Sequence, residues 1–279
     1  FYLSDESDLI IKGYGDPLLI SEQVADIAKK LAGRIRRVRH VVLDDTFFDK
    51  AIEIPGTRSH SLQPYDAPVG ALCVNFNTLA AKKENGRWHS AEPQTPLLPS
   101  ALRRLRNQPA GSDRILLSSN NKENLIYAGE LFAYYLDRTG VEIQETITVG
   151  RADPENSRLI LRHVSPFLLT EVISRIMAYS NNFMANQVLL ATGARVYGPP
   201  ATLEKGVQAL TAYARDKLGI FPVIAEGSGI SRKNRISARM FGPLLRAFAP
   251  YHHLLPEKDG IFCKTGTLDG IQTRAGYIV

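Results

Sequence analysis

The chain has 279 residues, of which 44% are hydrophobic and 22% are charged, and its net charge is +6 at pH 7. These values are typical of a soluble globular protein with room for one large domain or two. No apolar run is long enough to span a membrane. No signal peptide is visible at Phe1, so we expect the printed chain to start inside a longer one.

Basic residues cluster at positions 34–39 and 103–106. Nucleic-acid binding is one interpretation, but neither cluster is interleaved with stacking aromatic residues, which favours solvated helix ends or loops. Attraction to an anionic cell-wall polymer stays open. Cys73 and Cys263 each lie in an apolar run and are expected to be buried thiols. Neither the cysteines nor the six histidines show metal-ligand spacing, so we expect no metal site.

The first elements alternate between strand and helix. Residues 9–11 predict an apolar strand, Ser21 is expected to cap a helix that ends at Gly33, and residues 38–43 predict the next strand. This order is typical of the start of an α/β fold.

The second of these strands ends in an acidic group, Asp44 and Asp45, with Asp49 a little further on. The carboxylates either cap a loop, or one of them binds the ammonium group of a peptide side chain. For that second role we choose Asp45.

The middle of the chain predicts a hairpin of residues 72–83 and 87–89 about an Asn-Gly turn. Residues 91–113 are rich in proline and show little periodicity, so we interpret them mostly as loop. Ser119 and Lys122 then fit the pattern Ser-x-x-Lys, in which a serine nucleophile precedes a lysine base by one helical turn. The two intervening asparagines are good caps and poor helix formers, so we interpret this stretch as the start of a helix that ends at Gly140.

The last third predicts strands at residues 141–149 and 158–163, followed by several helices. Helix starts are expected at Ser165 with Pro166, at Thr202 and at Ser237. A polar junction, residues 179–183, interrupts the first of these helical patterns and presents Ser180 and Asn182. It is either a simple corner between helices or part of a site.

Residues 260–279 predict a β-hairpin whose turn is Asp269-Gly270. Its first strand carries Lys264-Thr265-Gly266. An ammonium group beside a hydroxyl suits a substrate carboxylate, and a glycine allows another backbone to approach closely. Alone, this tripeptide is weak support for a site.

Ser-x-Asn followed by Lys-Thr-Gly is two thirds of the signature of penicillin-recognising serine acyl-transferases, whose third element is Ser-x-x-Lys. The chain resembles one branch nearly end to end: the D-alanyl-D-alanine carboxypeptidase/endopeptidase family, the low-molecular-mass class C penicillin-binding proteins of serine peptidase family S13. Glu226 stands where this family usually has Asp. The stretches that carry the resemblance are residues 8–17, 43–49, 65–72, 75–77, 127–132 and 226–232 together with the two motifs.

The resemblance implies an α/β (α+β) fold: a transpeptidase/β-lactamase-like domain with an antiparallel sheet flanked by helices, plus an inserted smaller α/β domain. We expect residues 1–156 to form the inserted accessory domain and residues 157–279 to form the transpeptidase-like domain. The latter is expected to lack its Ser-x-x-Lys part and its last strand and helix within the printed chain. The nucleophile is therefore expected upstream of Phe1, and the printed chain alone is expected to be inactive.

The resemblance also implies the chemistry, which is acyl transfer through a serine ester. Ser180 would relay a proton to the departing amine, Asn182 would hydrogen-bond the amide of the acyl portion, and Lys264 would supply positive potential. Three residues of the hairpin would bind substrate: Thr265 through its hydroxyl, Gly266 by leaving space, and Thr267 through a backbone N–H of the oxyanion hole.

The expected function is a serine-type D-Ala-D-Ala carboxypeptidase/endopeptidase that acts on peptidoglycan stem peptides and binds β-lactams. Two alternatives stay open: a β-lactamase or esterase of the same superfamily, and an inactive wall-binding homologue. The resemblance implies a periplasmic or extracytoplasmic location, membrane association that is at most peripheral, no nucleic acid as partner, and no cofactor.

Overall fold

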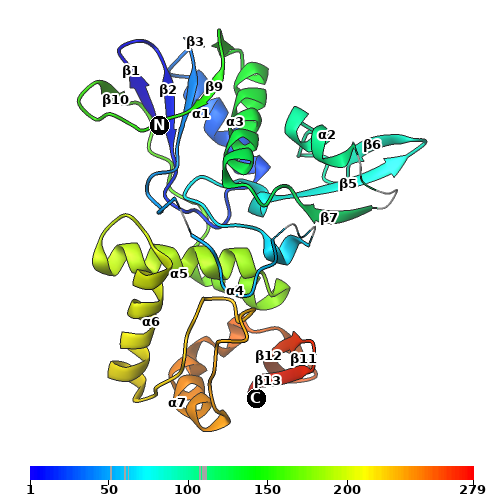
Figure 1. Cartoon of the computed structure of the whole chain (residues 1–279), viewed down its shortest axis with the longest axis vertical. Helices are drawn as coiled ribbons and strands as arrows, with labels where there is room; N and C mark the ends of the chain where they lie inside the picture. Colours follow the sequence, from blue (N-terminus) through cyan, green and yellow to red (C-terminus); the bar gives the residue numbers. More distant parts are fainter. Residues whose placement is uncertain (51, 60, 62, 107, 109–111) are drawn as a thin grey trace. The chain divides into compact units, whose positions relative to one another are not determined.

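The computed structural model describes residues 1–50, 52–59, 61, 63–106, 108 and 112–279 (Figure 1). The chain forms two compact units. Unit 1 comprises Phe1–Ile52 and Arg58–Ser165, and unit 2 comprises Glu53–Thr57 and Pro166–Val279. Helices and sheets occur in both units, so the predicted mixed class of α-helix and β-sheet is confirmed.

The boundary between the units differs from the predicted one at residues 156 and 157. Residues 157–159 pair with the first strand of unit 1, with Tyr2 opposite Leu159, so the chain leaves unit 1 only after Ser165. The short segment Glu53–Thr57 belongs to unit 2 because its backbone is packed against residue 231. A Cβ on Gly56 would lie 2.8 Å from the Cα of Ser231.

Unit 1 is built on a five-stranded mixed sheet of order β10-β1-β2-β4-β9. β10, β1 and β2 are antiparallel, whereas β2, β4 and β9 are parallel. The bounds of these strands are β1 (Tyr2–Ser4), β2 (Leu9–Lys12), β4 (Val41–Asp44), β9 (Ile147–Val149) and β10 (Ser157–Leu159). A two-stranded parallel pair, β3 (Arg37–Val38) with β8 (Glu142–Ile143), accompanies this sheet.

Helices α1 (Ser21–Ala32) and α3 (Asn121–Arg138) pack against each other, and α3 also contacts β4 and β9 (Figure 1). Apolar residues recur every three or four positions on α1, and this face is buried. On α3, Tyr127, Leu131 and Phe132 are completely buried. One continuous hydrophobic core therefore joins the sheet and both helices.

A second sheet of unit 1 has the order β6-β5-β7. The predicted hairpin is confirmed as β5 (Thr78–Glu84) and β6 (Arg87–Ser90), although β5 begins later than expected. Residues 75–77 have positive φ angles of 49°, 61° and 53°, which makes them a left-handed turn that cannot continue a strand. The prediction of loop for residues 91–113 is wrong in part, because α2 (Pro99–Leu105) buries Ala101 and Leu105 and β7 (Ser112–Leu116) pairs with β5.

Unit 2 begins with four helices, α4 (Leu169–Tyr179), α5 (Asn182–Tyr197), α6 (Leu203–Leu218) and α7 (Ala238–Phe248). The predicted start at Ser165 is wrong. Residues 166 and 167 form a bend, the ring of Phe167 lies under the Arg175 guanidinium at 5.1 Å, and the helix begins only after Leu168. The caps at Thr202 and Ser237 are confirmed, since each side chain accepts a hydrogen bond from the backbone N–H three residues on.

The chain closes with a three-stranded antiparallel sheet of order β11-β12-β13. Its strands are β11 (Glu257–Lys258), β12 (Ile261–Leu268) and β13 (Ile271–Ile278). The hairpin predicted about Asp269 and Gly270 is confirmed, and Gly270 adopts the positive φ of 73° that the turn requires. α7 and the 3₁₀ segment Ala249–Leu254 contact β13.

Candidate functional site

Ser180 lies where α4 ends and α5 is about to begin. Its backbone is left-handed, with φ 50° and ψ 44°, which stops α4 and leaves the side chain exposed. The next residue, Asn181, caps α5 by accepting a hydrogen bond of 2.9 Å from the N–H of Met184. The polar junction in the sequence therefore forms a tight corner, and Ser180 is held by backbone geometry.

Lys264 reaches this corner from β12. Its Nζ donates hydrogen bonds to the Oγ of Ser180 and, at 2.6 Å, to the carbonyl oxygen of Thr265. Partial burial disfavours the ammonium form and lowers the pKa of Lys264. Two residues that are 84 positions apart in the sequence are thus in direct contact within unit 2.

Thr265, Gly266 and Thr267 follow Lys264 on β12, and all three are exposed. In the described part of the sheet, β11 pairs with β12 only at Ile261 and Phe262, so the edge beyond them has no partner strand there. A Cβ on Gly266 would lie 2.6 Å from the Oγ1 of Thr273 on β13. A larger residue at position 266 would therefore have to displace this side chain of the neighbouring strand.

Asn182 is the first residue of α5, and its carbonyl oxygen accepts a hydrogen bond of 3.1 Å from the Nδ2 of Asn186. Asn186 is itself buried and also contacts Glu226 through the same nitrogen, at 3.2 Å. Asn186 therefore connects Asn182 of the predicted motif to the loop that contains Glu226, forty residues after Asn186 in the sequence.

Glu226 lies next to the start of α5, to which Asn186 connects it. In the sequence, this residue stood out only as part of the resemblance to the family. Its side chain is buried, and its carboxylate accepts hydrogen bonds within the loop that it begins. The donors besides Asn186 are the N–H and Oγ of Ser228 (2.6 Å each), the N–H groups of Gly229 (2.8 Å) and Ser231 (3.2 Å) and the Nδ2 of Asn234 (2.5 Å). The acidic residue followed by two glycines and two serines is the pattern that could have predicted this arrangement, in which several N–H and hydroxyl donors surround one carboxylate.

Asp45 lies in unit 1, just past the end of β4. Its Oδ1 accepts a hydrogen bond of 2.6 Å from the N–H of Leu72. Burial raises the pKa of Asp45 to about 6, even though this bond and a second one from the N–H of Ala71 oppose the shift. The carboxyl group thus holds the loop at residues 71 and 72, and its predicted role toward a substrate ammonium stays a prediction.

The stretch from Ser119 to Lys122 has the geometry of a helix cap. Asn120 is the N-cap of α3 and accepts a hydrogen bond of 2.9 Å from the N–H of Lys122. Ser119 lies before the cap, outside the helix, so its side chain is not one helical turn from Lys122. The capping interpretation is confirmed.

The basic cluster at residues 34–39 takes part in the fold of unit 1. Arg37 pairs with Glu142 at 3.0 Å, Arg39 pairs with Asp8 at 2.9 Å, and Arg34 donates to the carbonyl oxygen of Ile160. Arg37 thus lies in strand β3 and not in the predicted helix end or loop.

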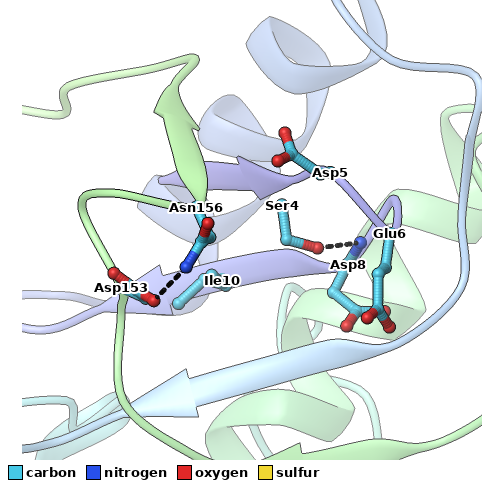
Figure 2. A pocket seen from close by; sticks show the side chains of 7 residues that line it. All are labelled: Ser4, Asp5, Glu6, Asp8, Ile10, Asp153 and Asn156. Atoms are coloured by element: carbon cyan, nitrogen blue, oxygen red, sulfur yellow. Dashed lines mark hydrogen bonds between the residues drawn. The ribbon is translucent and has the colours of Figure 1, made fainter.

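A shallow cavity of about 340 Å³ lies in unit 1, at the turn between β1 and β2 (Figure 2). Asp8 donates its N–H to Ser4 Oγ at 2.9 Å, and Asn156 donates to Asp153 at 2.7 Å. Its polar groups therefore stabilise the two loops that form it, and none of the predicted site residues lines it. The lining residues are Ser4, Asp5, Glu6, Asp8, Ile10, Asp153 and Asn156.

Cys73 is buried as expected, and burial raises the pKa of its thiol, whereas Cys263 is only half-buried, so that prediction is wrong for Cys263. The residues that the structure describes contain no group of three His, Cys, Asp or Glu side chains that could hold a metal ion. Among the same residues, no helix has both the length and the apolar character needed to cross a bilayer.

The model of the D-Ala-D-Ala carboxypeptidase 3 (S13) family matches residues 4–108 and 106–256. A crystal structure of penicillin-binding protein 4 (DacB) from Haemophilus influenzae superposes with a TM-score of 0.79 at 18% identity, over 99% of this chain and 76% of that one. The same protein in complex with a novel β-lactam gives a TM-score of 0.71, also at 18% identity, over 99% and 75%. No curated protein matches at a significant level.

Proposed function

Because the chain belongs to the D-Ala-D-Ala carboxypeptidase 3 (S13) family of serine-type peptidases, we propose that it serves as a D-Ala-D-Ala carboxypeptidase/endopeptidase. Its substrates are peptidoglycan stem peptides, and the reaction passes through an acyl ester on a serine. The observation that carries this proposal is the hydrogen bond from Lys264 Nζ to Ser180 Oγ, which joins the two motifs. Family S13 membership, which the sequence predicted, supports the same conclusion.

The contact between Lys264 and Ser180 fits proton delivery to a leaving group. Because Lys264 donates to Ser180 Oγ, the hydroxyl hydrogen of Ser180 is left to point at a third group. When the substrate amide breaks, Ser180 gives this proton to the departing amine and takes one from the Lys264 ammonium. The lowered pKa of Lys264 makes that second transfer easier. The nucleophilic serine that forms the ester is a further residue, and neither Ser180 nor Ser119 takes its role.

The exposed edge of β12 suits a substrate in extended conformation. A peptide laid along Lys264 to Thr267 would add a strand to the sheet through main-chain hydrogen bonds. Thr265 would then hydrogen-bond the terminal carboxylate, the N–H of Thr267 would donate to the oxyanion, and Asn182 would hydrogen-bond the amide of the acyl portion. The exposure of residues 265–267 supports this arrangement.

We propose a separate role for each of the two units. We assign unit 2 as the transpeptidase-like domain, since it holds Ser180, Asn182 and Lys264, and unit 1 as the accessory domain, whose Asp45 would bind the ammonium group of a stem-peptide side chain. We also propose that the protein binds β-lactams, which is supported by its likeness to a penicillin-binding protein whose complex with a β-lactam is known. Because the proposed substrate is peptidoglycan, we propose a periplasmic or other extracytoplasmic location for the protein.

The experiment that tests the proposal is labelling of the complete protein with a fluorescent penicillin, followed by peptide mapping of the modified residue. We expect a stable adduct on one serine that is neither Ser180 nor Ser119, and its slow release. Replacement of Lys264 by Ala should suppress the labelling.

The outcomes separate the alternatives. Rapid turnover of the penicillin, without a stable adduct, would assign the protein to the β-lactamases or esterases and reject the peptidase. A complete lack of labelling, with a folded protein, would leave the inactive wall-binding homologue. Release of D-alanine from a D-Ala-D-Ala pentapeptide by the complete protein is the direct measurement of the proposed activity.

A further inference from the structure

We propose that Arg232 and Glu226 are positioning residues, which hold the corner with Ser180 and the strand with Lys264 in register through the loop at residues 223–235. This inference rests on the proposed function, because it concerns the same site. The residues involved all belong to unit 2. A series of hydrogen bonds runs from α5, through the loop, to the hairpin of β12 and β13.

The loop is closed at its base and filled by its own polar side chains. Val223 and Arg235 exchange two backbone hydrogen bonds of 2.9 Å each, which join the ends of the loop. Inside it, Asn234 accepts a hydrogen bond of 2.6 Å from the N–H of Ala225 and donates one of 2.5 Å to Glu226. A loop that is closed in this way behaves as a compact rigid piece.

The loop is fixed to α5 at two points. Asn186 donates to the Glu226 carboxylate at 3.2 Å and accepts a hydrogen bond of 2.8 Å from the N–H of Gly227. Gly227 also packs tightly, since a Cβ there would lie 2.9 Å from the carbonyl oxygen of Ala185. Because Asn186 lies one turn after Asn182 and hydrogen-bonds its carbonyl oxygen, the loop is attached next to the start of α5.

The other end of the connection is Arg232, an exposed residue of the same loop. Its Nη2 donates a hydrogen bond of 2.5 Å to the carbonyl oxygen of Asp269, in the turn between β12 and β13. Asp269 directly follows the last residue of β12, and Lys264 is on the same strand. Arg232 therefore holds the free end of the hairpin.

These contacts form a closed ring. From Ser180 the ring follows the start of α5 to Asn186, whose side chain donates to Glu226. The loop then leads to Arg232, which donates to the carbonyl oxygen of Asp269. β12 leads back to Lys264, whose Nζ donates to Ser180. The contact between Lys264 and Ser180 is exposed and has a flexible lysine on one side, so it needs such support to keep one geometry. Small errors in the placement of reacting groups are costly in rate.

The test is the Arg232→Ala variant of the complete protein, measured alone and in combination with Ser180→Ala. Arg232 is exposed, so we expect the midpoint of thermal unfolding to stay within about 2 °C of the wild type. The rate constant of acylation by penicillin should fall about tenfold. In the Ser180→Ala background the same change should have almost no further effect, since the geometry that Arg232 maintains has lost its partner.

The matched control is Lys233→Ala, which removes an exposed cation from the neighbouring position of the loop and leaves Arg232 in place. Its acylation rate should equal that of the wild type. Arg232→Lys, which keeps a donor, should recover part of the lost rate.

The inference is overturned if Arg232→Ala is acylated as fast as the wild type, or if it slows acylation equally in both backgrounds. Either result leaves the proposed function intact, because the wild type is still labelled. Failure of the wild type to be labelled would instead reject the proposed function.

Discussion

The core of unit 1 and the elements of unit 2 that carry Ser180 and Lys264 differ in what stabilises them. The hydrophobic core cluster lies in unit 1, where the sheet, α1 and α3 bury side chains as large as Tyr127 and Phe132 completely. In unit 2, apolar side chains such as Phe183 and Leu190 are buried on α5. None of the described residues of α7, β12 or β13 is buried, however, and among those of α4 only Val172 is. The polar contacts of Glu226, Asn186 and Arg232 connect the elements that carry the predicted site.

Rigidity has a different origin in these two regions. Burial of apolar surface is strong and non-directional, so it stabilises unit 1 without fixing one particular polar group. Hydrogen bonds to a buried carboxylate depend on direction, so they fix the orientation of a loop and of its neighbours. A site that needs two side chains in contact gains from the second kind of support. Substitutions in the two regions should therefore have different effects on stability and on activity.

Phe132→Ala should give the largest loss of stability. The ring of Phe132 is completely buried and meets the ring of Phe1 edge-on at a centroid distance of 5.7 Å. Its removal leaves a cavity in the core of unit 1 and should cost about 3–5 kcal/mol in the free energy of unfolding. The comparison is Phe248→Ala on α7, a half-buried ring, for which we expect about 1 kcal/mol or less. Urea denaturation measures both, and equal losses would contradict the contrast between the units.

Lys264→Ala should reduce activity and leave stability almost unchanged. Loss of the group that contacts Ser180 should lower the rate constant of penicillin acylation by about 100- to 1000-fold, or roughly 3–4 kcal/mol of transition-state stabilisation. The control is Lys258→Ala, an exposed lysine of β11 in the same sheet, which should be acylated like the wild type. An acylation rate that Lys264→Ala does not change would remove Lys264 from the site.

Glu226→Ala should destabilise unit 2 although it removes few apolar atoms. The change deprives the buried donors of Asn186 and Ser231 and the half-buried N–H of Ser228 of their acceptor, which should cost about 3 kcal/mol. Glu226→Asp, which keeps a carboxylate on a side chain that is one methylene shorter, should recover more than half of the loss. A fall in stability of less than about 1 kcal/mol for Glu226→Ala would show that unit 2 does not depend on this network.

Replacement of Asp45 should have a smaller, pH-dependent effect on the free energy of unfolding of unit 1. Burial raises its pKa from 3.8 to about 6, so the folded state binds this proton more tightly than the unfolded state does. The stabilisation that comes from the protonated carboxyl is complete below about pH 4 and is lost as the pH rises through about 6. Asp45→Asn keeps an oxygen for the Leu72 N–H and cannot ionise, so it should be more stable than the wild type by about 2 kcal/mol near pH 8 and equal to it near pH 4.

Unfolding measured at several pH values checks this prediction against Asp49→Asn, an exposed carboxylate a few residues away, for which we expect no such trend. A constant difference between Asp45→Asn and the wild type from about pH 4 to pH 8 would contradict it.

Local patterns in the sequence predicted most elements of the fold. The caps at Asn120, Thr202 and Ser237 and the hairpin turn at Asp269 depend only on a few neighbouring residues, and all four are confirmed. The start of α4 and the strand predicted before Thr78 are wrong, because a bend at residues 166 and 167 and a run of positive φ angles interrupt patterns that continue in the sequence.

The neighbours Asp44 and Asp45 show what sequence could not separate. Burial alone would raise the pKa of Asp44, yet hydrogen bonds from Thr46, Ala152 and Lys12 lower it, whereas Asp45 meets mainly burial and its pKa rises. Two neighbouring aspartates therefore differ because Asp44 receives hydrogen bonds both from nearby Thr46 and from Ala152, which is 108 positions away in the sequence.

The family, the helix caps, the turns and the residue types of the site follow from short-range preferences and from motifs along the chain, so they could be predicted without a structure. The contact between Lys264 and Ser180, the hydrogen bonds of the loop to Glu226 and the reach of Arg232 to the hairpin turn became visible only in the folded chain. The reason is physical: hydrogen bonds between distant segments form only when the chain has folded, and no local preference encodes their partners.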